Sequence, residues 1–182
     1  MQKLNTQEFL SQYQEGRRDF RTVDLSQINL FEANLSQSNL SNCLLNEIHL
    51  PYANATQSQF QNSSLQNAEL SNSEFYQADF TGANLRGARL YRSSLRDTNL
   101  KEADLSGADL QAADLTCADL SGANLTGANL SNANLESAKL TGANLTGANL
   151  FRSQKVDLSG AILSPTTTLP DGYRITGSDP PG

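Results

Sequence analysis

The sequence predicts an all-β solenoid, in which the chain coils repeatedly around a continuous apolar interior. Three observations predict this fold. Every fifth residue from Phe20 to Leu150 is large and apolar: of these 27 positions, 22 hold Leu, four hold Phe and only Ala55 departs. The position two residues earlier holds Ala, Ser, Thr or Cys in 23 of the 27 units. The other three positions of each unit hold mainly polar residues and Gly.

A period of five fits neither an α-helix nor a flat strand. In an α-helix, residues five apart are rotated by about 140° from one another, so the leucines could not share one stripe. In a flat strand, residues five apart alternate between the two faces. The large and the small residue of a unit share one side only on a short extended segment, so the backbone must turn once per unit. Turns of one sense close the path into stacked coils.

The repeated units resemble those of the pentapeptide-repeat protein family. Units such as ANLRG at residues 83–87 and ADLSG at residues 103–107 follow the family's A(D/N)LXX pattern, and the resemblance covers about residues 17–163. It implies a right-handed quadrilateral parallel β-helix, with four units forming the four sides of each coil. At twenty residues per coil, this region makes about seven coils. A long series of units behind a short N-terminal α-helix is typical of cyanobacterial members, whose roles are mostly undefined.

One irregularity is expected at residues 50–56. Ala55 replaces a large interior residue and should leave a void or draw in a neighbour such as Tyr52. Pro51 has no backbone N–H to donate to a β ladder. We therefore expect a bulge in this part of the rod.

A second irregularity is expected at residues 153–155. The next clear units after Leu150, at 156–158 and 161–163, are displaced by three residues. Without an irregularity, Lys155 would point into the interior. Residues 153–155 are therefore interpreted as an inserted bulge.

The two flanks are expected to cap the strand edges of the terminal coils. Residues 1–16 predict a short α-helix whose Phe9, Leu10 and Tyr13 cover the first coil. Residues 164–182 hold four of the five prolines and predict an extended C-terminal cap that frays near Ser178. Strand edges at the ends can also recruit another chain, so end-to-end self-association is a further expectation.

Charge and composition argue against several classes of protein. The 182-residue chain has a formal net charge of −6, which argues against direct nucleic-acid binding, because that attraction comes from Lys and Arg. No apolar run approaches the roughly 18 residues that span a membrane, and no membrane partner is expected. The N-terminal stretch lacks the apolar core and cleavage site of a secretory signal, so a cytoplasmic location is expected.

Few residues that could carry catalysis are placed to act together. His49, the only histidine, falls on an outward position, and no serine stands in a nucleophile-elbow context. The sharpest carboxylate feature is the run Asp104, Asp109, Asp114 and Asp119. On a four-sided coil these residues project from four faces, so they form an acidic ring rather than a glycosidase-like pair. We expect the ring to serve solubility, assign no catalytic residue, and keep an enzyme on a β-helix as the least favoured function.

Neither a metal nor a cofactor is expected. Cys43 falls on an inward position and Cys117 on a corner nearly four coils away, a separation that excludes a disulfide or a shared zinc site. The acidic ring spreads its carboxylates too far apart for calcium, which needs clustered oxygen ligands. Both cysteines are predicted to be free thiols.

One side of the predicted coil gathers the residue types that interfaces favour. It is the side centred on Leu30 and the leucines that follow at intervals of twenty, and its outward residues include Phe31, Tyr52, Arg89, Tyr91, Arg92, Phe151 and Arg152. Aromatic residues and Arg are enriched at protein interfaces, so this set is the candidate contact face. The plainer alternative is that Phe31 and Phe151 pack under the caps and that Arg89 pairs with Asp109.

The pattern therefore favours a non-catalytic, rigid module that binds an unidentified protein or serves as a structural element. The resemblance implies an alternative, because some pentapeptide-repeat proteins mimic duplex DNA and occupy the DNA-binding surface of type II topoisomerases such as DNA gyrase. The rod shape and the negative charge permit this role. However, the column Asp79, Asn99, Asp119 and Lys139 forms a broken acidic stripe, and the chain has no long inserted loop.

Overall fold

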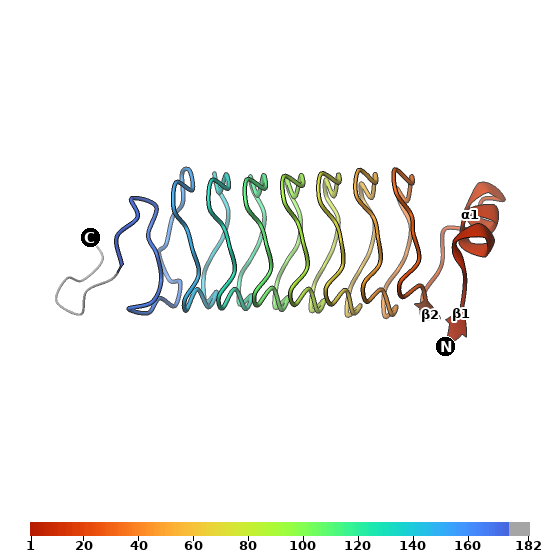
Figure 1. Ribbon diagram of the computed structural model, residues 1–182, viewed down its shortest axis with the longest axis horizontal. Coiled ribbons are helices and arrows are strands. Elements are labelled where there is room, and N and C mark those ends of the chain that lie inside the picture. Colours follow the sequence, from red (N-terminus) through yellow and green to blue (C-terminus); the bar gives the residue numbers. More distant parts are fainter. Residues whose placement is uncertain (175–182) are drawn as a thin grey trace.

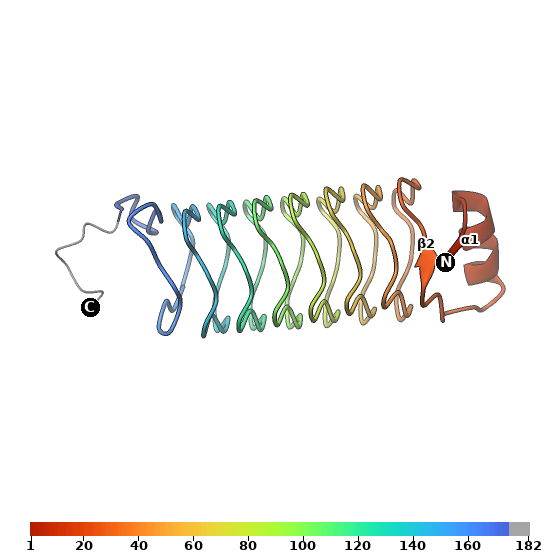
Figure 2. The ribbon, with the colours of Figure 1, turned by 90° about the horizontal axis from the view of Figure 1, so that it is seen from below.

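The computed structural model is a rod of stacked coils, with a helix at its N-terminal end (Figure 1, Figure 2). It describes residues 1–174. The strand β1 (Gln2–Lys3) pairs in parallel with β2 (Val23–Asp24), and α1 spans Thr6–Gln14. Beyond β2, single parallel bridges join the coils. Within the described chain, no helix has the length and apolar character needed to cross a membrane.

Each coil takes twenty residues through most of the rod. One bridge joins Asp19 to Asn39, and the same step of twenty residues recurs on ladders that lie five residues apart. In a typical unit, the N–H of Leu85 donates to the carbonyl of Asp104 in the next coil at 2.7 Å. The N–H of Ala88 closes a four-residue turn on the carbonyl of Leu85 at 3.0 Å. The five-residue period therefore corresponds to one bridged segment and one corner.

The interior is filled as the sequence pattern predicts. The large residues at every fifth position from Phe20 to Leu150 are buried. Phe60 and Phe80 stack with 4.7 Å between their ring centroids and 4° between their planes, and Phe75 packs edge-on against Phe80 at 5.4 Å. Each such side chain contributes about 1.5–3 kcal/mol before conformational entropy is subtracted. The apolar column is therefore the main source of stability.

The first coil is covered by α1 and β1. The side chain of Asn5 accepts the N–H of Glu8, and the carboxylate of Glu8 accepts the N–H of Asn5, both at 2.9 Å. This capping box fixes the start of the helix. The ring of Phe9 is buried, with its centroid 4.4 Å from that of Phe20. The pairing of β1 with β2, which the sequence analysis did not foresee, covers a strand edge of this coil.

The bulge expected at residues 50–56 does not form, and that prediction is wrong. Ala55 donates an ordinary ladder hydrogen bond of 2.7 Å to the next coil. Pro51 stands at the second position of a turn, where its fixed φ is favoured and where the backbone ladder uses no N–H. Ala55 is buried, and Phe75 stands at the equivalent position of the next coil, with its ring centroid 6.1 Å from that of Phe60 in an edge-to-face arrangement.

The irregularity expected at residues 153–155 is a shortened coil rather than an inserted bulge. Gln154 still bridges to the residue twenty positions earlier. Lys155 stands where a buried Leu would follow, but it is exposed and has a φ of 54°. The next bridge joins Asn144 to Ile162, only eighteen residues apart. An inward Lys would bury an unpaired charge. The side chain of residue 155 therefore points outward, and this coil takes eighteen residues instead of twenty.

The stack continues past residue 163, where the prediction ends it, and residues 169–174 then fold back, with Arg174 in an antiparallel bridge to Thr168. Thr167 is buried, and its hydroxyl donates to a backbone carbonyl of the preceding coil at 2.8 Å. Thr168 bridges the same preceding coil in parallel. The fraying predicted near Ser178 lies outside the described residues.

The corners adopt a left-handed backbone conformation, although many corner residues are not Gly. The third turn residue has φ of 57° at Ala112 and 66° at Gly107. This conformation costs an L-residue roughly 1–2 kcal/mol, whereas Gly adopts it freely. We expect Ala112→Gly to stabilise the protein by up to about 1 kcal/mol, since part of the gain is lost to the more flexible unfolded chain. The midpoint of urea unfolding measures this change.

The adjacent alanine provides the matched control. Ala113 is buried and lies outside the left-handed corner. Ala113→Gly should destabilise the protein, because it removes a packed methyl group and adds backbone freedom. Shifts of both variants in the same direction would contradict the assignment of strain to the corners.

A candidate protein-interaction face

The candidate contact face lies along one corner of the rod, on columns whose members follow at twenty-residue intervals. Backbone hydrogen bonds hold these columns in register; for example, the N–H of Glu32 donates to the carbonyl of Pro51 at 3.0 Å. Phe31 is 50% exposed, Tyr52 is 58% exposed and Phe151 is 38% exposed. The plainer alternative, in which Phe31 packs beneath the N-terminal cap, is therefore wrong.

Phe31, His49 and Tyr52 form an aromatic cluster on two adjacent coils. The ring centroid of Phe31 lies 5.8 Å from that of Tyr52 in an edge-on arrangement. It lies 6.5 Å from the imidazole centroid of His49, with 20° between the ring planes. From its outward position in the repeat, His49 is expected to be a solvated surface residue without a specific contact. The signal that could have placed it here is the twenty-residue step, which sets residue 49 beside the coil of residues 29–31.

Arg89, Tyr91 and Arg92 form a second group, the arginine cluster. The guanidinium of Arg92 lies 5.0 Å from the ring centroid of Tyr91, within the range of a cation–π contact. Arg89 pairs with Glu69 of the preceding coil at 3.3 Å, so the expected pairing with Asp109 is wrong. Asp109 instead accepts hydrogen bonds at its Oδ1 from the N–H of Gln111 and from the side-chain amide of Asn129.

Phe151 and Arg152 form a third group, close to the C-terminal end. The Arg152 guanidinium lies 4.9 Å from the Phe151 ring centroid. Gly172 lies against this ring, since a methyl group built on it would approach two ring carbons to 3.2 Å. The two coils between this group and the arginine cluster present Gln111, Ala112, Ser131 and Asn132 at the same corner. The candidate contact face is therefore three separate clusters on one line.

The acidic ring has structural contacts that the sequence analysis missed. The Oδ1 atoms of Asp104, Asp109, Asp114 and Asp119 each accept the backbone N–H two residues later, at 3.0–3.1 Å. Such Asx turns fix the entry to a corner. The carboxylate of Asp119 also meets Lys101 at 3.3 Å and Lys139 at 3.7 Å. Burial opposes ionisation of Asp119, but hydrogen bonds from Ser121 and Lys101 hold its pKa below the usual value.

Charge is arranged in bands along the rod. Residues 22–85, the acidic coils, contain six carboxylates and no Lys or Arg. Residues 86–101, the basic coil, contain Arg86, Arg89, Arg92, Arg96 and Lys101 and a single carboxylate, Asp97. Two of these cations pair with the acidic ring of the following coil, because Arg96 lies 3.8 Å from Asp114 and Lys101 lies 3.3 Å from Asp119. The acidic ring is therefore partly neutralised.

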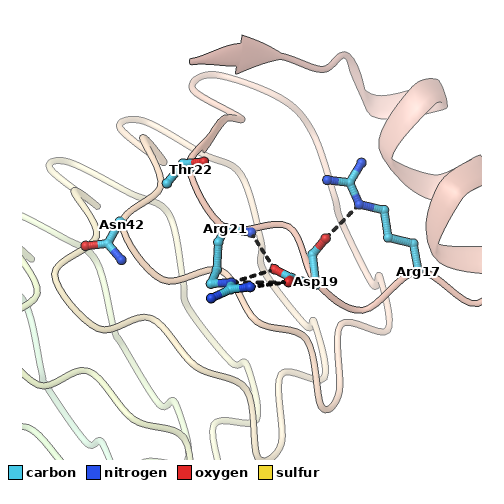
Figure 3. Close-up of a pocket in the computed structure, with 5 residues that line it drawn as sticks. All are labelled: Arg17, Asp19, Arg21, Thr22 and Asn42. Atoms are coloured by element: carbon cyan, nitrogen blue, oxygen red, sulfur yellow. Dashed lines mark hydrogen bonds and ion pairs between the residues drawn. The ribbon is translucent and has the colours of Figure 1, made fainter.

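A shallow pocket near α1 is lined by Arg17, Asp19, Arg21, Thr22 and Asn42 (Figure 3). Its charged groups already bind one another. Arg21 donates to both carboxylate oxygens of Asp19, at 2.9 and 2.7 Å, and lowers the pKa of Asp19 to about 2. Arg17 donates to the backbone carbonyl of Asp19 at 2.7 Å. The sequence does not predict this pocket. Because its Arg and Asp side chains already form hydrogen bonds with one another or with the backbone, few of their donors and acceptors remain for a ligand.

The residues considered for metal or redox chemistry stand apart. Across residues 1–174, no three His, Cys, Asp or Glu side chains are grouped closely enough to hold a metal ion. Cys43 is buried, its thiol lies 3.0 Å from the carbonyl oxygen of Phe20, and burial raises its pKa. Cys117 is an exposed free thiol. Neither cysteine is placed to act with the other.

Comparison with protein families identifies the repeated unit. The family model that describes pentapeptide repeats in eight copies matches residues 19–46, 28–67, 58–97, 93–132, 118–153 and 128–164. These matches together cover most of the chain. No curated protein sequence matches it.

Several solved structures resemble the chain. HetL, a pentapeptide repeat protein involved in heterocyst differentiation regulation in the cyanobacterium Nostoc sp. strain PCC 7120, is 30% identical over 94% of this chain and 100% of its own, with a TM-score of 0.36. A second protein of that cyanobacterium, alr5209, is 30% identical over 90% of this chain and 98% of its own, with a TM-score of 0.32. Trypsin-treated QnrB1, a plasmid-mediated fluoroquinolone resistance protein, is 21% identical over 80% of this chain and 82% of its own, with a TM-score of 0.51, a likeness of fold.

Proposed function

Because this chain belongs to the pentapeptide-repeat family, we propose that it is a non-catalytic module that binds another protein through the candidate contact face. The observation that carries this proposal is the line of three clusters on one side of the rod, one of them aromatic and two of them pairing an aromatic ring with Arg. The proposed frame is the right-handed, four-sided β-helix of about seven coils that the resemblance implies.

The rigidity of the frame supports this role. The backbone of each corner is tied by a ladder hydrogen bond and by a turn hydrogen bond, so little backbone entropy is lost when a partner binds. Tyr and Arg contribute strongly at interface centres, where they bury large areas and also form hydrogen bonds. We place the module in the cytoplasm, where its two unpaired cysteines would stay reduced.

Affinity capture with matched surface variants tests the proposal. The immobilised protein should retain a specific partner from an extract of the organism that encodes it. Phe151→Ser with Arg152→Ser, and Tyr91→Ser with Arg92→Ser, should each reduce that retention at least about tenfold, because they remove interface anchors. Mass spectrometry of the retained protein, with the wild-type chain as reference, measures the loss.

The control uses the same residue types at another corner. Tyr76 and Arg96 are exposed and lie twenty residues apart on a different column. Tyr76→Ser with Arg96→Ser should leave capture unchanged. Equal retention by all variants, each with an unaltered melting temperature, would refute the proposed face.

DNA mimicry is the second candidate, favoured by the net charge of −6 and the two acidic regions of the rod. Against it, the basic coil interrupts the negative surface, and Arg96, Lys101 and Lys139 pair with the acidic ring. Inhibition of DNA gyrase supercoiling by the purified protein, weakened by salt, would move this candidate ahead of the first. Variants of Asp79, Asp104 and Asp109 would then locate the mimicking surface.

A further inference from the structure

The aromatic cluster and the arginine cluster lie on the same columns and complement each other. We propose that this part of the candidate contact face binds a second copy of the chain, side by side and antiparallel. The inference rests on the proposed function, because it names a partner for the same face. Tyr52 and Asn72 belong to consecutive coils, and the two-fold axis would cross the rod midway between them.

The symmetry determines which residues meet. A two-fold axis that lies in the contact plane and runs across the rod sets each column opposite its own reversed copy, as an isologous interface requires. Residues at equal distances from the axis then face one another. Phe31 faces Tyr91 of the second copy, and Glu32 faces Arg92. Both pairs occur twice in the dimer.

The aromatic pairs supply apolar contact at both ends of this patch. Phe31 is half exposed, so half of its ring surface remains available for burial by a partner. Tyr91 is partly exposed and already carries the Arg92 guanidinium over its ring. Aromatic pairs contribute beyond their buried area when the rings stack with an offset or meet edge-on.

The ionic pair joins two groups that lack an opposite charge within their own chain. Among the described residues, neither Glu32 nor Arg92 forms an ion pair, and the recorded contact of the Arg92 side chain is with Tyr91. The bridged column beside them follows the same symmetry, so that His49 faces Glu69 of the second copy. In the dimer, Glu32 and Arg92 would therefore form an ion pair, and His49 and Glu69 would lie within reach of a hydrogen bond.

In the middle of the patch, the exposed Tyr52 faces Asn72 of the second copy, and two small residues lie beside them. Pro51 is buried at its corner, and Ser71, which would face it from the second copy, is a small, partly buried residue. Charge favours the same arrangement at both ends of the patch, because the antiparallel order sets the first part of the acidic coils, residues 22–36, against the basic coil of the other copy. These bands attract over roughly one Debye length.

The size of the patch predicts a weak dimer. Phe31 and Tyr91 lie three coils apart, which is about 14 Å at the usual strand spacing. Such a patch buries less than the roughly 800 Å² per partner of a standard stable interface. We expect a dissociation constant on the order of 10–100 µM, and tighter association at low salt.

Sedimentation velocity from about 5 to 500 µM, a range that spans the expected dissociation constant, tests the proposal. The wild-type chain should pass from monomer to dimer. Glu32→Arg and Arg92→Glu should each weaken dimerisation at least about tenfold, because each sets like charges face to face twice. The double variant, Glu32→Arg with Arg92→Glu, should recover most of the wild-type affinity, since the pairs are restored with their signs exchanged.

The double variant also distinguishes the orientation, because a parallel dimer would set residue 32 against residue 32 and would not recover. Arg152→Glu is the matched control: Arg152 lies on the same column beside an aromatic ring but outside the patch, and its variant should dimerise normally. The proposal is overturned if the wild-type chain stays monomeric at the highest concentration, if the double variant does not recover, or if Arg152→Glu weakens the dimer as much as Arg92→Glu does. A dimer that neither Glu32→Arg nor Arg92→Glu weakens would indicate end-to-end association and would also overturn the proposal.

Failure of the dimer leaves the proposed function separately testable. The Phe151 and Arg152 variants probe a cluster that the dimer does not use, so loss of heterologous capture in them does not depend on self-association. A chain that stays monomeric and still captures its partner would refute only the dimer.

Discussion

Leu105→Asp is expected to unfold the rod. Leu105 is fully buried in the apolar column, among other Leu and Ala side chains. Burying an unpaired carboxylate there should cost more than about 5 kcal/mol, which is a large part of the stability of a protein of this size. Loss of the circular dichroism signal and of cooperative thermal unfolding at neutral pH would report the effect.

The neighbouring residue gives the control for that substitution. Asp104 faces outward, and its Oδ1 accepts hydrogen bonds from Ser106 and Asn124. Asn keeps an Oδ1 acceptor, and it stands at the equivalent position of the coils before and after, as Asn84 and Asn124. Asp104→Asn should therefore change the unfolding free energy by less than about 0.5 kcal/mol. Equal melting temperatures for the two variants would mean that inward and outward positions are assigned wrongly.

Phe80→Ala is expected to have the next largest effect. Its ring is fully buried, stacked on Phe60 at 4.7 Å and in edge-on contact with Phe75 at 5.4 Å. Removing it leaves a cavity between closed coils that can collapse only slightly, so the loss should be about 3–5 kcal/mol. Urea unfolding followed by circular dichroism measures it.

Phe80→Leu tests whether shape or mere apolar burial matters at this position. Leu is the common residue of the column and fills most of the space, so we expect a loss of less than half that of the Ala variant. If the Leu variant were as unstable as the Ala variant, the contacts among the three aromatic rings, rather than apolar burial alone, would stabilise this part of the rod.

The periodic part of the fold was predictable from sequence because one physical requirement repeats without change. Each unit needs a large inward residue and a small one, and the column from Phe20 to Leu150 records that requirement directly. The errors arose where a single residue was judged without its neighbours. The small side chain of Ala55 predicted a bulge, but the backbone ladder, which does not depend on side-chain size, continues through this unit. The units after Lys155 are displaced by three residues, which with a period of five can mean either three residues inserted or two deleted. The sequence alone does not distinguish the two, and the structure shows the deletion.

The sequence predicts which residues share the corner of the candidate contact face, but it does not predict which side chains contact one another there. The twenty-residue step placed Tyr91 and Arg92 on one corner, since that placement depends only on the period. The pairing of Arg89 with Glu69 rather than Asp109 depends on the direction in which the Arg89 side chain extends, which the column does not reveal. His49 was missed for the same reason, because its contact is with a ring in the preceding coil.

The cap formed by β1 and α1 precedes the coils in chain order, which bears on how the protein is made. A ribosome delivers roughly 5–20 residues per second, so a twenty-residue coil emerges every few seconds. The helix and the first coil can assemble before the later coils exist, and the open edge of the newest coil then serves as the template for the next. Synthesis and folding would advance in the same direction, with one growing edge at any moment.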